Sequence, residues 1–263
     1  MCGRLGGSRR LVTGVMVAAA GAIFITGCGK GHAAPPTGGR PAPTAKLPQA
    51  TTFTALSGIP QDAASATAGD GTVVHPTTSV PVSAVPGGPP VAVLPSTQLG
   101  SPTWVPVVET KPGWQRVLLP SRPNHAAGWV ETGGAEFQTA HSPYVIKVDI
   151  SARRLTLVKS GQRLGTWAVA VGATKTPTPT GRTFVLASLA PAKPTYSPLI
   201  LPIGAHSPTL DTFGGGPGTV AFHGWPQQSV FGKAVTNGCV RVPSDALARL
   251  SKVPLGTTVL ITG

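Results

Sequence analysis

The stretch Thr236-Asn237-Gly238-Cys239-Val240-Arg241-Val242 places a cysteine between a glycine and a short apolar strand, in a chain of 263 residues. Sixteen residues before the cysteine, the stretch Ala221-Phe222-His223-Gly224 ends an apolar run with a histidine. Cysteine chemistry requires a thiolate, and a nearby imidazole that accepts the thiol proton supplies it near neutral pH. The two stretches therefore predict a nucleophile, Cys239, and its base, His223.

Two neighbours of the cysteine fit acyl transfer. Gly238 lets backbone N–H groups come close to the oxyanion that acyl transfer forms. Arg241 follows the cysteine by two residues, so an extended backbone puts both side chains on one face, where the guanidinium can bind a carboxylate. The residues alone leave two alternatives open, with Cys239 as a buried inert thiol and Arg241 as a solvated surface charge.

Residues 142–263 are predicted to form a β-sandwich with one short helix. Pro243–Val253 is expected to be that helix, because Pro, Ser and Asp stand at its start and because Leu247 and Leu250 share one face. Apolar runs bounded by turn residues predict the strands Val145–Ile150, Arg154–Lys159, Gly165–Val171, Thr183–Ser188, Thr219–Phe222 and Thr257–Thr262.

Residues 71–141 are predicted to form a second, smaller β unit. The turn signals Pro86-Gly87-Gly88 and Lys111-Pro112-Gly113 separate short strand-like runs, which together suggest a small β-barrel. Its tryptophans can serve packing or ligand binding, and the sequence leaves both open. The predicted strands are Thr72–His75, Val80–Val85, Val91–Pro95, Trp104–Glu109, Trp114–Leu119 and Gly128–Glu131.

The first 27 residues are typical of a secretory signal. Arginines precede the apolar run Leu11–Ile25, and its 15 residues fall short of the ~20 needed to span a bilayer. The run ends in Ile25-Thr26-Gly27-Cys28, which resembles the bacterial lipobox and predicts that Cys28 is lipidated and becomes the new first residue. Acyl chains there would anchor the protein to the outer face of the membrane. An ordinary signal peptide with a chance cysteine is the alternative.

Residues 28–70 are expected to be a disordered tether between that anchor and the β units. Ala, Gly, Pro, Thr and Ser fill 30 of the 42 positions from 29 to 70. Such a composition cannot bury enough apolar surface to offset the entropy of ordering.

The last 122 residues resemble the YkuD-type L,D-transpeptidase domain of bacterial cell-wall enzymes. The resemblance is carried by the His-Gly strand, by Thr-x-Gly-Cys-Val-Arg, by the opening hairpin and by the Pro-Thr-rich loop Thr176-Pro177-Thr178-Pro179-Thr180-Gly181. Residues 71–141 resemble the SH3-like modules of bacterial cell-wall proteins. The fold class expected is therefore mainly β, with a small SH3-like barrel followed by the catalytic β-sandwich.

The resemblance implies a function and roles for the site. Cys239 would attack the carbonyl preceding the terminal D-Ala of a peptidoglycan stem peptide, with His223 as base, oriented by a backbone carbonyl near Gly224. N–H groups at Gly238 and Cys239 would hold the oxyanion, and Arg241 would bind a stem carboxylate. Carbapenem-type inhibitors are expected to acylate the cysteine. The alternatives are an L,D-carboxypeptidase, a protein-to-wall transferase of the same fold, and a non-catalytic wall-binding lipoprotein.

Two further positions belong to the candidate site. The family often has a histidine where this chain has Asn237, which cannot act as a base and is interpreted as shaping the loop or donating a hydrogen bond. His206 is the other histidine of residues 142–263, and it could lie near the cleft and contact substrate or serve packing.

Charge and composition exclude other classes of function. The formal charge is +13, of which +9 belongs to residues 142–263, where 12 Lys and Arg face 3 Asp. Secretion makes a nucleic-acid partner implausible, so anionic wall polymers, lipid headgroups and substrate carboxylates are the expected partners. Two histidines and three aspartates without ligand spacing predict no metal site, and no cofactor is expected. The absence of Glu from this segment disfavours a paired-carboxylate glycosidase.

Overall fold

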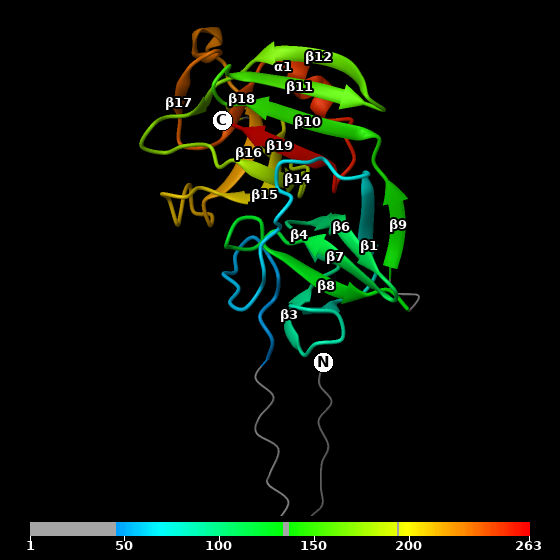
Figure 1. The fold of residues 1–263 in the computed structure, drawn as a ribbon. Coiled ribbons are helices and arrows are strands. Elements are labelled where there is room, and N and C mark those ends of the chain that lie inside the picture. The colour runs from blue at the N-terminus through cyan, green and yellow to red at the C-terminus, as the bar shows by residue number, and fades with distance from the viewer. Residues whose placement is uncertain (1–45, 134–136, 194) are drawn as a thin grey trace, which may run out of the picture. The chain divides into compact units, whose positions relative to one another are not determined.

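The computed structural model describes residues 46–133, 137–193 and 195–263 (Figure 1). The predicted signal, the lipobox with Cys28 and the first part of the tether lie outside the described residues and stay predictions. Within the described ranges, no helix combines the length and apolar character that crossing a bilayer requires.

The N-terminal half contains a seven-stranded sheet in the order β3-β2-β8-β7-β6-β1-β9. The six strands predicted between residues 71 and 134 are confirmed within a few residues, whereas β9 and the two-stranded β4-β5 hairpin were not predicted. The SH3-like barrel itself stays a prediction. The bounds are β1 Thr72–Pro76, β2 Val80–Ser83, β3 Pro90–Leu94, β4 Thr97–Gln98, β5 Ser101–Pro102, β6 Val105–Lys111, β7 Trp114–Leu118, β8 Ala127–Glu131 and β9 Phe137–His141.

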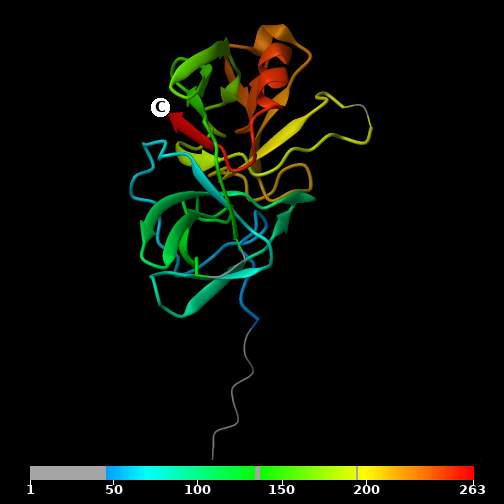
Figure 2. The same cartoon turned by 90° about the vertical axis from the view of Figure 1, so that its right-hand side faces the viewer.

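The C-terminal half contains a five-stranded sheet, β12-β11-β10-β19-β14, a three-stranded sheet, β15-β16-β18, and the two-stranded pair β13-β17. Figures 1 and 2 show β9 leading out of the seven-stranded sheet into β10. The bounds are β10 Tyr144–Asp149, β11 Arg154–Lys159, β12 Gln162–Ala168, β13 Val171–Gly172, β14 Gly181–Phe184, β15 Ile200–His206, β16 Thr219–Gly224, β17 Ala234–Thr236, β18 Val240–Val242 and β19 Thr258–Thr262, with the 3₁₀ turn η1 at Gln228–Val230 and helix α1 at Ser244–Leu250.

The core of this half lies between the five-stranded sheet, the three-stranded sheet and α1. Alternate residues of β10 and β11 point inward, and Leu247 and Leu250 of α1 join the same core as Phe222 of β16. The predicted mainly β fold with one short helix is thereby confirmed. Strand β15 was missed because Pro202 and Gly204 argue against a strand, and its pairing with β16 is indeed irregular between Pro202 and His206.

Residues 46–70, hereafter the strap, contradict the expected tether. In Figure 1 the strap is coloured from blue to cyan. It forms backbone hydrogen bonds with the N-terminal half. Ala50 N–H donates to Val93 O at 2.7 Å and Leu56 N–H donates to Arg122 O at 2.8 Å. Ala50 and Leu56 are both buried. The disorder prediction fails here because the polar backbone of the strap finds partners on the folded protein, which composition does not reveal.

Candidate active site

Cys239 and His223 come together because β16 and β18 are parallel neighbours. His223 is paired with Arg241, and Cys239 stands immediately before β18, in line with Ala221. Paired residues, and residues two apart along a strand, project to the same face of a sheet. The strand pairing therefore gathers the predicted nucleophile, base and arginine on one face.

The hydrogen bonding of His223 shows which of its two ring nitrogens can accept a proton. Its Nδ1 lies 2.8 Å from the carbonyl oxygen of Gly224. A carbonyl only accepts hydrogen bonds, so Nδ1 carries the hydrogen and Nε2 of the neutral ring is left to take a proton. The expected backbone carbonyl near Gly224 is thus the carbonyl of Gly224 itself. The buried ring also packs against the Tyr196 ring in a T-shaped arrangement, with 4.9 Å between ring centroids.

The electrostatics of the pair favour two neutral groups at rest. Burial lowers the pKa of His223, opposed by the bond to Gly224 and reinforced by Arg241. Burial raises the pKa of the Cys239 thiol, and a backbone hydrogen bond at Ala221 and the charge of Arg241 oppose it in part. At rest the proton is therefore favoured on the Cys239 sulfur, and the neutral His223 ring is free to accept one.

The backbone beside Cys239 is held by threonine hydroxyls. Gly238 has φ of +112°, a conformation that favours glycine. The Thr236 hydroxyl donates to the Cys239 carbonyl at 2.6 Å and accepts from the Gly238 N–H at 3.1 Å. The Thr178 hydroxyl donates to the Gly238 carbonyl at 2.9 Å. The Gly238 N–H, predicted to hold the oxyanion, is therefore engaged with Thr236 instead.

Arg241 is packed rather than freely solvated. The central carbon of its guanidinium lies 3.6 Å from the Trp225 ring centroid, and the Trp225 and Tyr196 rings lie 5.3 Å apart. Such stacking holds a cation in a fixed direction. Arg241 Nε is buried and has no hydrogen-bond partner among the described residues. The arginine is thus oriented on the face it shares with Cys239.

A pocket of about 340 Å³ adjoins these aromatic residues. Its walls are mostly apolar, so it suits an uncharged portion of a ligand next to the His223 strand. It is lined by Tyr196, Pro198, Leu199, Gly224, Trp225, Pro226, Gln228, Ser244, Leu247, Ala248 and Ser251. Tyr196 and Trp225 were not predicted from the sequence, although the position of Trp225, two residues after His223, was a usable signal.

Comparison with known proteins assigns the chain to a family. The sequence profile of the YkuD L,D-transpeptidase catalytic domain matches residues 143–261. YqjB of Bacillus subtilis, assigned by name as an L,D-transpeptidase, is 31% identical over 128 residues, which cover 46% of this chain and 71% of YqjB. The chain belongs to the YkuD L,D-transpeptidase family.

This YkuD chain is also similar to other proteins. YkuD of Bacillus licheniformis, also named as an L,D-transpeptidase, is 36% identical over 121 residues, which cover 46% of this chain and 66% of that protein. The chain thus spans slightly less than two thirds of that relative. A solved L,D-transpeptidase from Mycobacterium smegmatis is 17% identical, with a TM-score of 0.39 over 60% of this chain and 82% of that one.

The prediction that His206 contacts substrate of the YkuD domain is wrong. Its side chain is fully buried, and its Nε2 lies 2.8 Å from the Thr52 carbonyl and 3.0 Å from the Thr52 hydroxyl. Its backbone N–H and carbonyl both bond to the Asn124 side chain. His206 therefore packs against the strap. Asn237 is exposed in the loop before Cys239, and its predicted role stays a prediction.

Lowering the pH from about 6.5 to about 4 is expected to remove about 3 kcal/mol from the free energy of unfolding through His206. Burial, reinforced by Arg122, lowers the pKa of His206 from 6.5 to about 4, so the unfolded chain binds this proton while the native chain does not. Urea unfolding of wild type and His206→Gln at pH 7 and pH 4 measures the contribution. Equal losses of stability in the two proteins would contradict the assignment.

Proposed function

We propose that this chain is an L,D-transpeptidase that forms peptidoglycan cross-links through an acyl-enzyme on Cys239. One observation carries the proposal. Cys239 and His223 share a face of the β16-β18 pair, and the bond from His223 Nδ1 to Gly224 leaves Nε2 as the proton acceptor. Membership of the YkuD family supports the reaction class.

The first half of the reaction forms a thioester. The Cys239 sulfur attacks the carbonyl carbon that precedes the terminal D-Ala of a donor stem peptide, while His223 Nε2 takes the thiol proton. The backbone N–H of Cys239 is the remaining predicted donor to the oxyanion. When the tetrahedral intermediate collapses, the carbon–nitrogen bond breaks and the leaving amine of D-Ala takes the proton from His223.

The second half transfers the acyl group. The side-chain amine of a diaminopimelate residue in another stem attacks the thioester, and His223 accepts the proton that this amine loses. The carbon–sulfur bond then breaks, and the proton returns from His223 to the Cys239 sulfur. The new amide bond is the cross-link, and the enzyme is restored without a cofactor.

Arg241 orients the substrate in this proposal. Its stacking on Trp225 fixes the guanidinium on the face that carries Cys239. A fixed planar guanidinium matches a carboxylate with two parallel hydrogen bonds. A stem-peptide carboxylate bound there would place the scissile carbonyl beside the sulfur.

Carbapenem-type β-lactams are the proposed inhibitors, acylating Cys239. The solved structure of L,D-transpeptidase 3 from Mycobacterium tuberculosis, 16% identical with a TM-score of 0.39 over 53% of this chain and 74% of that one, carries a faropenem-derived adduct. The reactive carbonyl of a β-lactam takes the place of the stem-peptide carbonyl in the first half-reaction.

The proposed location is the outer face of the cell membrane. Lipidation of Cys28 would anchor the chain, and residues 29–45 would lead from the anchor to the strap. The charge of +9 on residues 142–263 suits work among anionic wall polymers, and no nucleic acid is expected there.

The full chain tests the function in two assays. With a carbapenem, intact-protein mass spectrometry should show one covalent adduct, and peptide mapping should place it on Cys239. With a tetrapeptide donor and a diaminopimelate acceptor, D-Ala and a cross-linked product should both appear. D-Ala release without a cross-link would instead indicate an L,D-carboxypeptidase. Binding to sacculi with no adduct would indicate a non-catalytic wall-binding lipoprotein.

A further inference from the structure

Five consecutive residues, Thr178-Pro179-Thr180-Gly181-Arg182, connect the N-terminal half of the chain to the Cys239 loop. This stretch, hereafter the brace, makes a specific polar contact at every second residue. Thr178 bonds to the Gly238 carbonyl, the Thr180 carbonyl bonds to His125, and Arg182 pairs with Asp62. One end of the brace thus touches the nucleophile loop, and the other end touches the strap and the β7-β8 connection.

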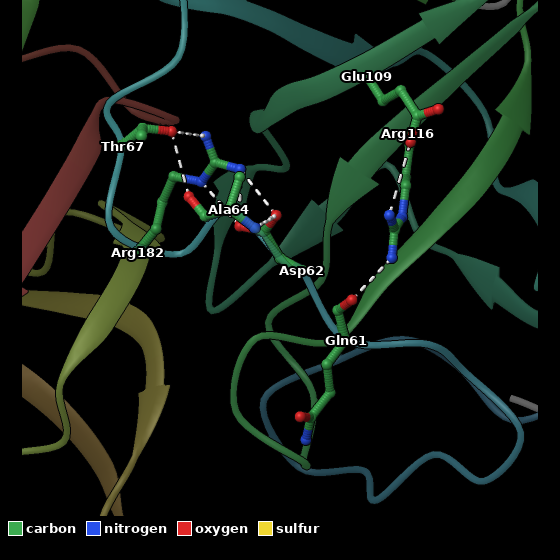
Figure 3. A network of polar contacts seen from close by, with 7 residues as sticks. All are labelled: Gln61, Asp62, Ala64, Thr67, Glu109, Arg116 and Arg182. Carbon is green, nitrogen blue, oxygen red and sulfur yellow. Dashed lines mark hydrogen bonds and ion pairs between the residues drawn. The ribbon is translucent and has the colours of Figure 1, made fainter.

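The contact of Arg182 with Asp62 is a buried, two-pronged ion pair, shown in Figure 3. Arg182 Nε and Nη2 donate to the two carboxylate oxygens at 2.8 Å each, and the side chains are only 3% and 4% exposed. Asp62 is itself fixed, because its N–H donates to the His125 carbonyl at 2.8 Å. A buried charge without its partner is costly, so the pair strongly favours one position of the brace against the strap.

The contact of His125 with the brace is equally close. Its Nε2 donates to the Thr180 carbonyl at 2.8 Å. At Gly181, where φ is +105°, a Cβ atom would collide with the His125 ring. The absence of a side chain at this position therefore permits the imidazole to lie directly against the backbone of the brace.

The contact at Thr178 reaches the nucleophile. Its buried hydroxyl donates to the Gly238 carbonyl and accepts from the Gly172 N–H, both at 2.9 Å. Just before the brace, the Thr176 hydroxyl donates to the Thr236 carbonyl, also at 2.9 Å. These bonds hold the loop on the N-terminal side of Cys239. A shift of the brace would accordingly shift the sulfur relative to His223.

We infer that Asp62 and His125 are positioning residues, which hold the Cys239 loop in its reactive geometry through the brace. The inference rests on the proposed function, because its effect is read as the reactivity of Cys239. The strap and the N-terminal half thereby become part of what makes the catalytic domain active. A displacement of about 1 Å at a reacting atom costs roughly a hundredfold in rate, so a loosened brace is measurable even when the fold survives.

A double-variant experiment on the full chain tests the path. Asp62→Asn keeps the shape but removes the charge, and Thr178→Val keeps the shape but removes the hydroxyl. Each is expected to slow carbapenem acylation of the folded protein by roughly tenfold, with the double variant no slower than the slower single. Thr178→Ser, which keeps the hydroxyl, should restore the rate. Urea unfolding curves, measured in parallel, correct each rate for the folded fraction.

The matched control is Glu109→Gln. Glu109, whose side chain is 42% exposed, forms an ion pair with Arg116 at 3.6 Å in the same half of the chain, also shown in Figure 3, and does not touch the brace. The carbapenem should acylate Glu109→Gln at the wild-type rate. If Asp62→Asn fails to fold, His125→Asn replaces it, because asparagine suits the φ of +67° at that position but is too short to reach Thr180.

Two results would overturn the inference while leaving the function intact. One is a wild-type rate of carbapenem acylation in Asp62→Asn or His125→Asn. The other is a double variant whose loss of rate equals the product of the losses in the two single variants. A wild-type chain that forms no adduct would reject the proposed function instead. In that case, the rate of Cys239 alkylation by iodoacetamide, compared among the same variants, decides the positioning role.

Discussion

Replacing Cys239 with alanine should abolish the carbapenem adduct and lower cross-link formation by at least about 10⁴-fold, as expected when a covalent nucleophile is removed. No other described residue on this face carries a thiol, because Cys239 is the free cysteine found among the described residues. The measurement is intact-protein mass spectrometry, together with quantification of cross-linked product from defined stem peptides.

Matched cysteine variants make this result specific. Cys28→Ala changes the predicted lipidation site and lies outside the catalytic segment, so it should keep the adduct and its rate. The free energy of unfolding of Cys239→Ala should stay within about 1 kcal/mol of the wild-type value, because the cysteine side chain is small and partly exposed. An undiminished adduct on Cys239→Ala would refute the nucleophile assignment.

Replacing His223 with glutamine should slow acylation by about 10² to 10⁴-fold, the usual contribution of a positioned general base. Glutamine can still bond to the Gly224 carbonyl through its amide, but it cannot accept a proton at neutral pH. His141→Gln is the matched control, because His141 lies on β9 and bonds to the Asp70 carbonyl. Equal rates in wild type and His223→Gln would contradict the role of His223.

The pH profile distinguishes a general base from a preformed ion pair. Burial lowers the pKa of His223 below its ordinary 6.5, so the wild-type rate should stay constant to below pH 6.5 before falling as the imidazole takes a proton. Burial raises the pKa of the Cys239 thiol above 9.0. Without the base, the acylation rate of His223→Gln should therefore keep rising with pH up to and beyond 9.0, as the thiol loses its proton to solvent. An unchanged profile in the variant would indicate that another group removes the thiol proton.

The chemistry of the site could be predicted from local sequence. Cys239, His223 and Arg241 follow strand-forming residues at short spacings, and α1 begins and ends within the predicted range. Such signals are local, because a few consecutive residues determine a strand, a helix end or a glycine turn. The partner of His223, the Gly224 carbonyl, is also adjacent in sequence.

The rest of the site depends on contacts between residues far apart in sequence. Tyr196, which precedes β15, reaches His223 on β16, and Asp62 reaches Arg182 across 120 positions. The same holds for His206, a candidate substrate-binding residue by its sequence, whose ring instead bonds to the distant Thr52 carbonyl. Composition correctly described the strap as rich in small residues but did not show that the folded protein supplies partners for its backbone.

The sequence by itself determined which chemistry is available: a thiol, an imidazole with a neighbouring carbonyl, and an arginine on one strand face. The tertiary structure alone decided which backbone amides are engaged, which rings surround Arg241, and that the strap and the brace bear on the Cys239 loop. The physical reason is that reactive groups are encoded by residue type and local spacing. Burial and hydrogen-bond pairing instead depend on which distant segments fold against one another.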